Sequence, residues 1–388
     1  MTIVQGTPSW LRATNDRTAL SLLLEHGSLT RNRIGELSGL SKPTASHMVS
    51  RLEGAGLIHT VGEVSGGRGP NAASYSVRLD RVLGVAIDIS GLTIRSTVVD
   101  AAGREYQVVE RTLSASAKVR SAISDVRGAI AAACEASNTD PDAVVLVCIG
   151  VQASIDPRTD ELSFTEALPG WPRKGVLQLL EDDLGCAVII DNDVNLAAVA
   201  ERHRGHGVSA PGFALLWMGA GLGLAVDLGG TVHRGAAGGA GEIGYLPVPK
   251  AATALDPDAD DLQDLIGGPA VVRLARDTGL RARSYPAMLD QIETADSRDA
   301  LLVALAPRIA LGVIPVLAVL DPEIVVLGGP TGAVGGDRLA ELVQAQVKSA
   351  SRWSPRIVTS GVRKNPVLSG ARDVLTTEVR NTLLGIAR

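Results

Sequence analysis

Apolar residues recur at intervals of three and four positions near the start of the chain, which predicts three consecutive helices. The first covers 17–26 and the second covers 31–38, where Thr30 can serve as the N-cap. Ser41 can cap the third helix. The apolar face of that third helix is formed by Ala45, Met48, Val49 and Leu52. Two helices joined by a short turn before a third predict a helix-turn-helix arrangement.

Two short strands follow, at 57–64 and 73–79, around the turn 66–70, and they predict a hairpin wing. The outward side of the third helix is short, polar and rich in donors, as a helix in the DNA major groove needs. The candidate contacts on this helix are Lys42, Thr44, Ser46, His47, Ser50 and Arg51. Candidate phosphate contacts are Arg31, Arg33, Lys42 and, in the wing, Arg68.

An ordinary solvated face on a small helical domain is the alternative interpretation of this polar surface. The turn Gly-Leu-Ser-Lys-Pro-Thr at 39–44 and the wing that follows favour DNA binding over that alternative. The sequence therefore predicts a winged helix-turn-helix DNA-binding domain over residues 1–80.

From residue 81 the pattern becomes a β-meander plus helices, and it occurs twice. The first copy has expected strands at 82–89, 93–99, 104–113, 143–149 and 188–190, with helices at 118–135 and 174–184. The second copy has expected strands at 213–218, 223–227, 230–233, 323–327 and 356–359, and helices at 261–277, 299–320 and 336–350. A final helix is expected at 368–384. The repetition predicts an α/β protein with two similar lobes around a cleft that binds the ligand.

Three polar residues, Asp191, Asn192 and Asp193, lie together where the strand at 188–190 gives way to a helix. Carboxylate and amide groups at such a junction can accept from and donate to the hydroxyls of a polyol. The same residue types also cap helices. Taken alone, this stretch favours the capping interpretation, and other parts of the chain are needed to support a ligand site.

Charge and cysteine content fit a DNA-binding module attached to a larger sensor. The net charge of the 388 residues is −5, but residues 1–80 hold 8 Lys and Arg against 6 Asp and Glu. Cys134, Cys148 and Cys186 show no close pairing, which is typical of a reducing compartment. There is no signal-peptide pattern, and no apolar run approaches about 18–20 residues. We therefore predict a cytoplasmic protein that does not span a membrane.

Several motifs together resemble the ROK family, which groups repressors and sugar kinases on the actin/hexokinase-like fold. They are LSKPT in the third helix, LPGW at 168–171, DNDVNLAA at 191–198, RGAAGGAGEIG at 234–244 and DPEIVVLGG at 321–329. The resemblance covers nearly the whole chain, and its N-terminal part is similar to the repressor branch. It implies a winged helix-turn-helix domain followed by the actin/hexokinase-like two-lobed domain.

The first phosphate turn departs from the family pattern. Kinases of the family carry Asp-x-Gly-Gly-Thr between the first two strands, and this chain has Ser90 and Leu92 in place of the first Gly and the Thr. In the second glycine turn, Ala220 stands where a hydroxyl residue is common. We interpret the ATP site as decayed, and Asp193, which is similar to the family's catalytic base, as a sugar ligand. No cofactor and no catalytic residue are predicted.

The family's zinc site is also missing from the sequence. Tyr245 replaces its His, and the loop 250–262 contains no Cys, so a tetrahedral N/S site cannot be built there and no metal is predicted. Gln263 stands where a sugar-binding Glu follows that loop. By resemblance, the ligand-binding residues are Asn192, Asp193, Glu242, Tyr245 and Gln263.

The sequence thus predicts a transcriptional regulator, as a repressor, that binds operator DNA and responds to a sugar or sugar-phosphate effector. We expect a homodimer or homotetramer, and we expect the effector to bridge the two lobes and close them. The lobes are expected at 81–192, joined by 368–388, and at 193–367. One alternative is an ATP-dependent sugar kinase with a fused DNA-binding head. Another is a regulator with a vestigial pocket and a protein partner.

Overall fold

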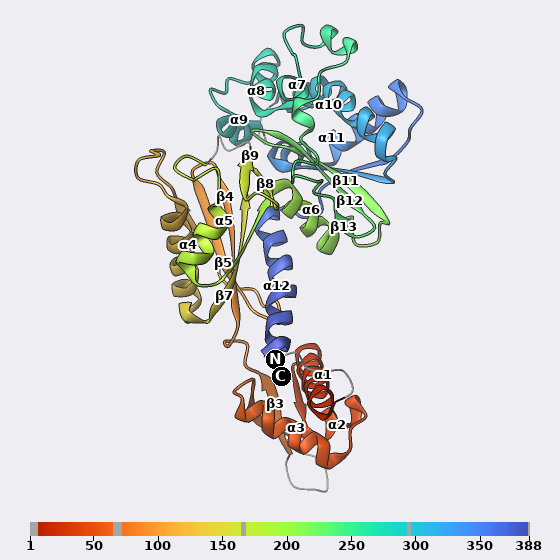
Figure 1. The fold of residues 1–388 in the computed structure, drawn as a ribbon. Helices are drawn as coiled ribbons and strands as arrows, with labels where there is room; N and C mark the ends of the chain where they lie inside the picture. The colour runs from red at the N-terminus through yellow and green to blue at the C-terminus, as the bar shows by residue number, and fades with distance from the viewer. Residues whose placement is uncertain (1–6, 65–71, 164–167, 293–295, 387–388) are drawn as a thin grey trace. The chain divides into compact units, whose positions relative to one another are not determined.

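A computed structural model describes residues 7–64, 72–163, 168–292 and 296–386 (Figure 1). The chain forms two compact units. The first consists of residues up to Ile149 together with Leu177–Ile189 and Arg372–Arg388. The second consists of Gly150–Val176 and Ile190–Ala371. Residues 150–176, which the sequence places in the first lobe, thus belong to the second unit.

The N-terminal part has the winged helix-turn-helix arrangement that the sequence predicts. Its helices are α1 (Pro8–His26), α2 (Arg31–Ser38) and α3 (Lys42–Gly54), and its strands are β1 (Ser28–Thr30), β2 (Ile58–Val64) and β3 (Ala72–Val77). Thr30 and Ser41 cap α2 and α3 through their side chains, as expected. Strand β1 was not predicted; it pairs with β3 in a sheet of order β1-β3-β2. The wing turn at 66–70 lies outside the described residues.

A small apolar core fixes which side of α3 faces outward. Leu20 and Leu23 of α1, Ile34 of α2, and Met48 and Val49 of α3 are all buried. These residues occupy the apolar face that the spacing predicts, so the opposite face of α3 is left exposed.

The rest of the chain contains two five-stranded sheets with the same internal order. In the first, the strands are β4 (Leu83–Ser90), β5 (Thr93–Val99), β6 (Val109–Thr112), β7 (Val144–Val151) and β10 (Ala187–Asn192). In the second, they are β11 (Gly212–Met218), β12 (Leu222–Leu228), β13 (Thr231–Val232), β14 (Ile324–Gly328) and β15 (Arg356–Thr359). Numbered by their place in each copy, both sheets run 3-2-1-4-5. The predicted duplication is confirmed.

Helices accompany the strands of each copy. In chain order they are α4 (Ala122–Ser137), α5 (Val176–Leu184), α6 (Asp193–Arg204), α7 (Leu262–Ile266), α8 (Gly268–Asp277), α9 (Tyr285–Ile292), α10 (Arg298–Leu320), α11 (Gly329–Ala350) and α12 (Pro366–Ile386). A two-stranded hairpin, β8 (Ser154–Asp156) with β9 (Glu161–Ser163), precedes α5.

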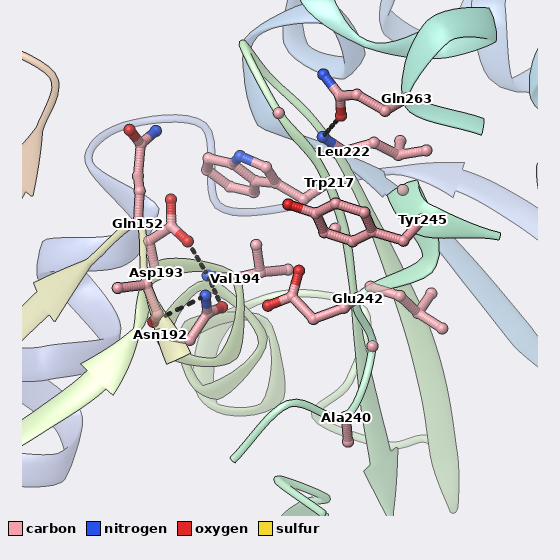
Figure 2. A pocket seen from close by; sticks show the side chains of 16 residues that line it. Gln152, Asn192, Asp193, Val194, Trp217, Leu222, Ala240, Glu242, Tyr245 and Gln263 are labelled. Carbon is pink, nitrogen blue, oxygen red and sulfur yellow. Dashed lines mark hydrogen bonds between the residues drawn. The ribbon is translucent and has the colours of Figure 1, made fainter. Parts of the chain in front are cut away.

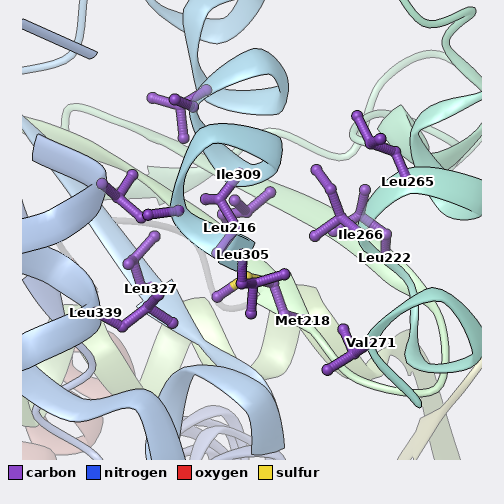
Figure 3. Close-up of a cluster of buried hydrophobic side chains, with 14 of the residues drawn as sticks. Leu216, Met218, Leu222, Leu265, Ile266, Val271, Leu305, Ile309, Leu327 and Leu339 are labelled. Carbon is purple, nitrogen blue, oxygen red and sulfur yellow. The ribbon is translucent and has the colours of Figure 1, made fainter. Parts of the chain in front are cut away.

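Alternating side chains of β11 place the second sheet between two apolar layers. Phe213 and Leu215 point to the face covered by α6. Leu216 and Met218 point to the other face, where they meet Leu305 and other residues of α7, α8, α10 and α11 (Figure 3). Because both faces are covered, the strand ends are the part of this sheet left available for a site.

Several predicted boundaries differ from the structure. The helix expected at 261–277 is broken into α7 and α8 by Gly267, whose backbone is extended (ψ 165°). Helix α11 begins at Gly329 rather than at 336, and Gly336 in it has non-helical dihedral angles. Strand β6 is shorter than the expected 104–113. Helix α9 and the hairpin β8–β9 had no periodic signal in the sequence and were missed.

Helix α10 is long and apolar enough to cross a membrane by length and composition, whereas no apolar run of about 18–20 residues was expected from the sequence. More than half of its most apolar window is buried inside the protein. Leu301, Leu305 and Ile309 belong to the core of the second unit, so this helix packs as a core helix.

Candidate functional site

The three polar residues at the start of α6 make three different sets of contacts. Asp191 is buried and accepts hydrogen bonds from the Arg234 guanidinium at 2.6 and 3.0 Å. Asn192 is the N-cap, and its Oδ1 accepts from the backbone N–H groups of Val194 (2.9 Å) and Asn195 (3.3 Å). Asp193 is 7% exposed and lines a cavity. The capping interpretation therefore applies to Asn192, which also lines the cavity, and Asp193 lies with its side chain at the cavity.

A second carboxylate is brought to the same cavity by a loop of glycines. Glu242 lies after Gly241, whose φ of 93° is a conformation that favours glycine. A Cβ on Gly241 would also collide with the carbonyl oxygen of Leu224, so the loop lies directly against β12. Ser154 of β8 donates a hydrogen bond to Glu242 Oε1 at 2.8 Å. This contact holds the carboxylate at the wall of the cavity.

The cavity has a volume of about 410 Å³, within the range of about 300–1,000 Å³ that is typical of small-molecule sites (Figure 2). Its polar or aromatic lining side chains are Gln152, Asn192, Asp193, Trp217, Glu242, Tyr245 and Gln263. The structure thus brings together all five residues predicted to bind the ligand.

All of these residues lie in the second unit, whereas the sequence predicted a ligand that bridges two lobes. The expected bounds placed Asn192 at the end of the first lobe and Asp193 at the start of the second. They belong to the second because α6 packs against β11 and β12 of the second sheet. The cavity can therefore form within one compact unit.

The side-chain amide of Gln263 forms two hydrogen bonds with the glycine turn between β11 and β12. Its Oε1 accepts from the Leu222 backbone N–H at 2.8 Å, and its Nε2 donates to the Ala220 carbonyl oxygen at 3.0 Å. The predicted sugar contact is thus a residue that holds the turn at the edge of the cavity.

Trp217 is a lining residue that the sequence analysis missed. It is the penultimate residue of β11, and its indole Nε1 lies 3.0 Å from the position of a Cβ on Gly219. Tyr245 is 61% exposed and also lines the cavity. Figure 2 shows both rings on the same wall of the cavity, facing Asp193 and Gln152.

Gln152 and Ser154 were also missed. Gln152 directly follows β7, and Ser154 begins β8 shortly after it. The carboxyl end of a buried strand is where α/β proteins place ligand contacts, so their position in the pattern was the signal. The same rule would have marked Trp217 at the end of β11.

The first glycine turn, 88–92, belongs to the first unit. Asp88 is buried in β4, and burial raises the pKa of its carboxyl to about 6, against the opposing effect of Arg95 at 3.5 Å. Leu92 is 44% exposed at the tip of the turn. Ser90 adds a side chain at the position where the resemblance to the family's kinases implies close approach of a phosphate to the backbone.

The residues predicted to contact DNA fall into two groups. Lys42, Thr44, His47 and Ser50 are exposed on α3, and Arg33 is exposed on α2, where it forms an ion pair with Glu36 at 3.0 Å. Ser46 is half-buried and accepts from Arg31 at 3.3 Å. Arg68 lies outside the described residues.

Two of the predicted arginine contacts make hydrogen bonds inside the head. Arg31 donates to the Tyr75 hydroxyl at 2.8 Å and lies over the Tyr75 ring. Arg51 forms an ion pair with buried Asp16 of α1 at 2.6 Å. These contacts join the helices to one another and to β3, and they hold both guanidinium groups in fixed positions.

Two family models match the chain. The ROK family model matches residues 84–378, and a winged helix-turn-helix DNA-binding model matches residues 12–59. A putative xylose repressor from Caldicellulosiruptor sp. is 22% identical over 63% of this chain and 61% of its own length. A glucokinase from Halalkalibacterium halodurans is 23% identical over 67% of this chain and 84% of its own length. The matched region thus spans less than two thirds of the repressor.

Among solved structures, a ROK family transcriptional regulator, a homologue of the E. coli MLC protein, matches with a TM-score of 0.66. The match covers 96% of this chain and 99% of that protein at 15% sequence identity. At this identity the likeness establishes the fold, including the head and the duplicated domain.

Proposed function

The chain belongs to the ROK family, and from that premise we propose that it is a DNA-binding transcriptional regulator, acting as a repressor, whose ROK domain senses a sugar. In this proposal α3 reads operator DNA and the cavity beside α6 binds the effector. The alternative is an ATP-dependent sugar kinase with a fused DNA-binding head. No cofactor and no metal are part of the proposal.

The observation that carries the proposal is that one chain contains both an exposed polar face on α3 and a polar cavity beside α6. The outward face of α3 exposes donors and acceptors of the size that the major groove accommodates. The cavity presents two carboxylates and three amides, the groups that bind polyol hydroxyls in proteins. A kinase needs the second of these surfaces and has no use for the first.

The glycine turns support regulation over phosphoryl transfer. The turn at Asp88 carries Ser90 and Leu92 where phosphate would need bare backbone and a hydroxyl. The turn at Gly219 is held by Gln263, which occupies the Leu222 N–H. We therefore propose that the protein is not an enzyme.

Operator recognition is proposed to involve a homodimer or homotetramer acting in the cytoplasm. Two winged helices related by symmetry would contact two half-sites, and the effector would change how well both heads fit them at once. A symmetric footprint of two half-sites about one helical turn apart, or a multiple of that distance, is expected.

The test uses purified full-length protein. DNA selected from a random library is expected to converge on one motif, and a gel shift with that motif should respond to at least one sugar of a panel. Equal affinity for all sequences, with no response to any sugar, would refute the regulator. Release of ADP in a coupled assay at about 1–100 s⁻¹, the usual range for kinases, would establish the alternative.

A further inference from the structure

The groups beside the cavity that could bind an anion are already engaged. At the N-terminus of α6, the Val194 N–H donates to Asn192 Oδ1 and Asp193 Oδ1, each at 2.9 Å. The Asn195 N–H donates to Asn192 Oδ1 at 3.3 Å. Asn192 and Asp193 thus occupy the backbone donors that make a helix N-terminus attractive to phosphate.

The glycine turn on the opposite side is engaged in the same way. The Gly219 N–H donates to the Gly221 carbonyl oxygen at 2.9 Å, and the Leu222 N–H donates to Gln263 at 2.8 Å. Two backbone N–H groups of this turn, those of Gly219 and Leu222, thus already have acceptors within the chain and are not available to a phosphate.

The charges inside the cavity also disfavour the binding of a phosphate. Its lining contains the carboxylates Asp193 and Glu242, and none of the described lining residues is Lys, Arg or His. The neighbouring guanidinium of Arg234 is held by Asp191 at 2.6 Å. A phosphate carries about −1.5 to −2 charges near pH 7, so it would lose its hydration beside two like charges and gain no cation.

The opposite wall is aromatic and opens to solvent. Trp217 and Tyr245 lie on it (Figure 2). The next residue in the chain, Leu246, is 41% exposed. A sugar ring that reaches Asp193 and Glu242 satisfies the polar side of the cavity and leaves much of the Tyr245 ring in water. A hydrocarbon substituent on that sugar would cover the ring.

We infer that the effector is an uncharged glycoside, a sugar whose substituent lies on Tyr245 and Trp217, and that phosphorylated sugars are rejected. This inference rests on the proposed function, because it names the ligand class of the same cavity. It narrows the earlier expectation of a sugar or a sugar phosphate.

The experiment measures thermal shifts and then affinities on the full-length protein. The probes are glucose, xylose and galactose, their 1-phosphates, glucose 6-phosphate, and the α- and β-phenyl glycosides of the same three sugars. At least one phenyl glycoside is expected to bind more tightly than its free sugar, and the phosphates are expected to give no shift. Binding of any phosphate as tightly as its uncharged parent overturns the inference.

Tyr245→Ala tests the aromatic wall directly. It should weaken phenyl glycoside binding about fivefold more than it weakens binding of the free sugar, since the substituent lies on the ring. Tyr245→Phe, which keeps the ring, should restore affinity. Val319→Ala, a change at another exposed apolar residue, is the matched control.

The outcomes separate the inference from the proposed function. If free sugars bind and control DNA while the phenyl glycosides bind no better, the inference fails and the sugar sensor stands. If no sugar or glycoside in the panel binds, the proposed sensor function fails and the inference fails with it.

Discussion

Asp191, Asn192 and Asp193 show how neighbouring residues of similar chemistry acquire different roles. The side chain of Asp191 turns to Arg234, Asn192 turns to the helix N-terminus, and Asp193 faces the cavity. Sequence alone identifies the group, because polar residues after a buried strand are conspicuous. It cannot divide the roles, because the division depends on Arg234, a residue 43 positions away in the chain from Asp191.

Asp193→Asn is expected to weaken sugar binding and preserve the fold. The amide oxygen can still accept from the Val194 N–H, but the carboxylate contact to a desolvated hydroxyl is lost, at a cost of about 1–3 kcal/mol. Sugar affinity by titration calorimetry and melting temperature by fluorescence check this on one preparation. Asn192→Ala is the contrasting variant, since loss of the cap lowers stability by about 1 kcal/mol even in the absence of sugar. Unchanged affinity in Asp193→Asn would place the ligand elsewhere.

Asp88 gives a prediction about pH. Burial raises the pKa of its carboxyl to about 6, whereas an unfolded Asp has a pKa of about 3.9. The folded state therefore binds the proton more tightly, and this contribution to stability is full below about pH 4 and lost as the pH rises through about 6. Asp88→Asn should remove that loss and stabilise the protein at pH 8 by an amount on the order of 2–3 kcal/mol.

Melting curves of the parent and of Asp88→Asn between pH 4.5 and pH 8 measure this difference. The two curves should lie closest at pH 4.5, diverge between pH 4.5 and about 6, and stay a constant distance apart above pH 6, with the variant higher. Ser90→Ala, in the same turn, is the control and should follow the parent at every pH. A constant difference between the two curves over the whole range would mean that Asp88 does not titrate within it.

At the scale of elements, α3 shows what periodicity can and cannot predict. The spacing of its apolar residues predicts which side is buried, and Ser41 predicts where it begins. The partners of its charged residues were not predictable from the spacing. Asp16 lies on α1, and its contact with Arg51 depends on how α1 packs against α3 in the tertiary structure. Arg51 was expected to read bases, yet its guanidinium is held at 2.6 Å by Asp16.

His47→Ala and Arg33→Ala should affect DNA binding differently. His47 is exposed at the middle of α3, where side chains reach base edges, so its loss should reduce preference for the selected motif by about 1–3 kcal/mol. Arg33 is exposed on α2 and should contact phosphate, so its loss should weaken binding to all sequences and lower the salt dependence. Gel shifts with the selected motif and a scrambled duplex, at two salt concentrations, distinguish these effects.

Arg51→Ala serves as a third variant in that series. It leaves the buried Asp16 carboxylate without its ion pair, so a lower melting temperature is expected in the absence of DNA. If Arg51→Ala instead keeps its melting temperature and loses sequence preference, Arg51 reads bases as the sequence suggested. Parent-like binding by both His47→Ala and Arg51→Ala would exclude α3 as the reading helix.

For the whole molecule, the sequence predicts the duplication and the winged head because both are carried by local patterns. The order 3-2-1-4-5 recurs in both sheets, as two copies of one unit require. The allocation of the cavity to the second unit was not predictable from the same patterns. It depends on the packing of α6 against β11 and β12. Periodicity predicts the elements themselves but does not predict which elements pack against one another.

Coupling between the sugar cavity and the head has a physical candidate in α12. Within the second unit, Gly370 of α12 lies directly against the backbone of Leu196 in α6, the helix that begins at Asp193, and a Cβ at 370 would collide with the Leu196 carbonyl oxygen. Within the first unit, Arg17 of α1 donates to the Leu384 carbonyl oxygen near the end of α12 at 3.2 Å. One continuous helix therefore contacts both α6 and α1.

Arg17→Ala is expected to reduce the effect of sugar on DNA binding while leaving each binding event intact. Arg17 lies in neither the cavity nor α3, so sugar affinity without DNA and DNA affinity without sugar should stay within twofold of the parent. The ratio of DNA affinities with and without sugar should fall by about 2- to 10-fold, because one hydrogen bond of about 0.5–1.5 kcal/mol is removed from the link. Arg12→Ala, which changes an exposed arginine on the same helix, is the matched control.

Since coupling is reciprocal, DNA must change sugar affinity by the same reduced factor, and both titrations should agree. A parent-like ratio in Arg17→Ala would show that the signal does not pass through the Leu384 end of α12.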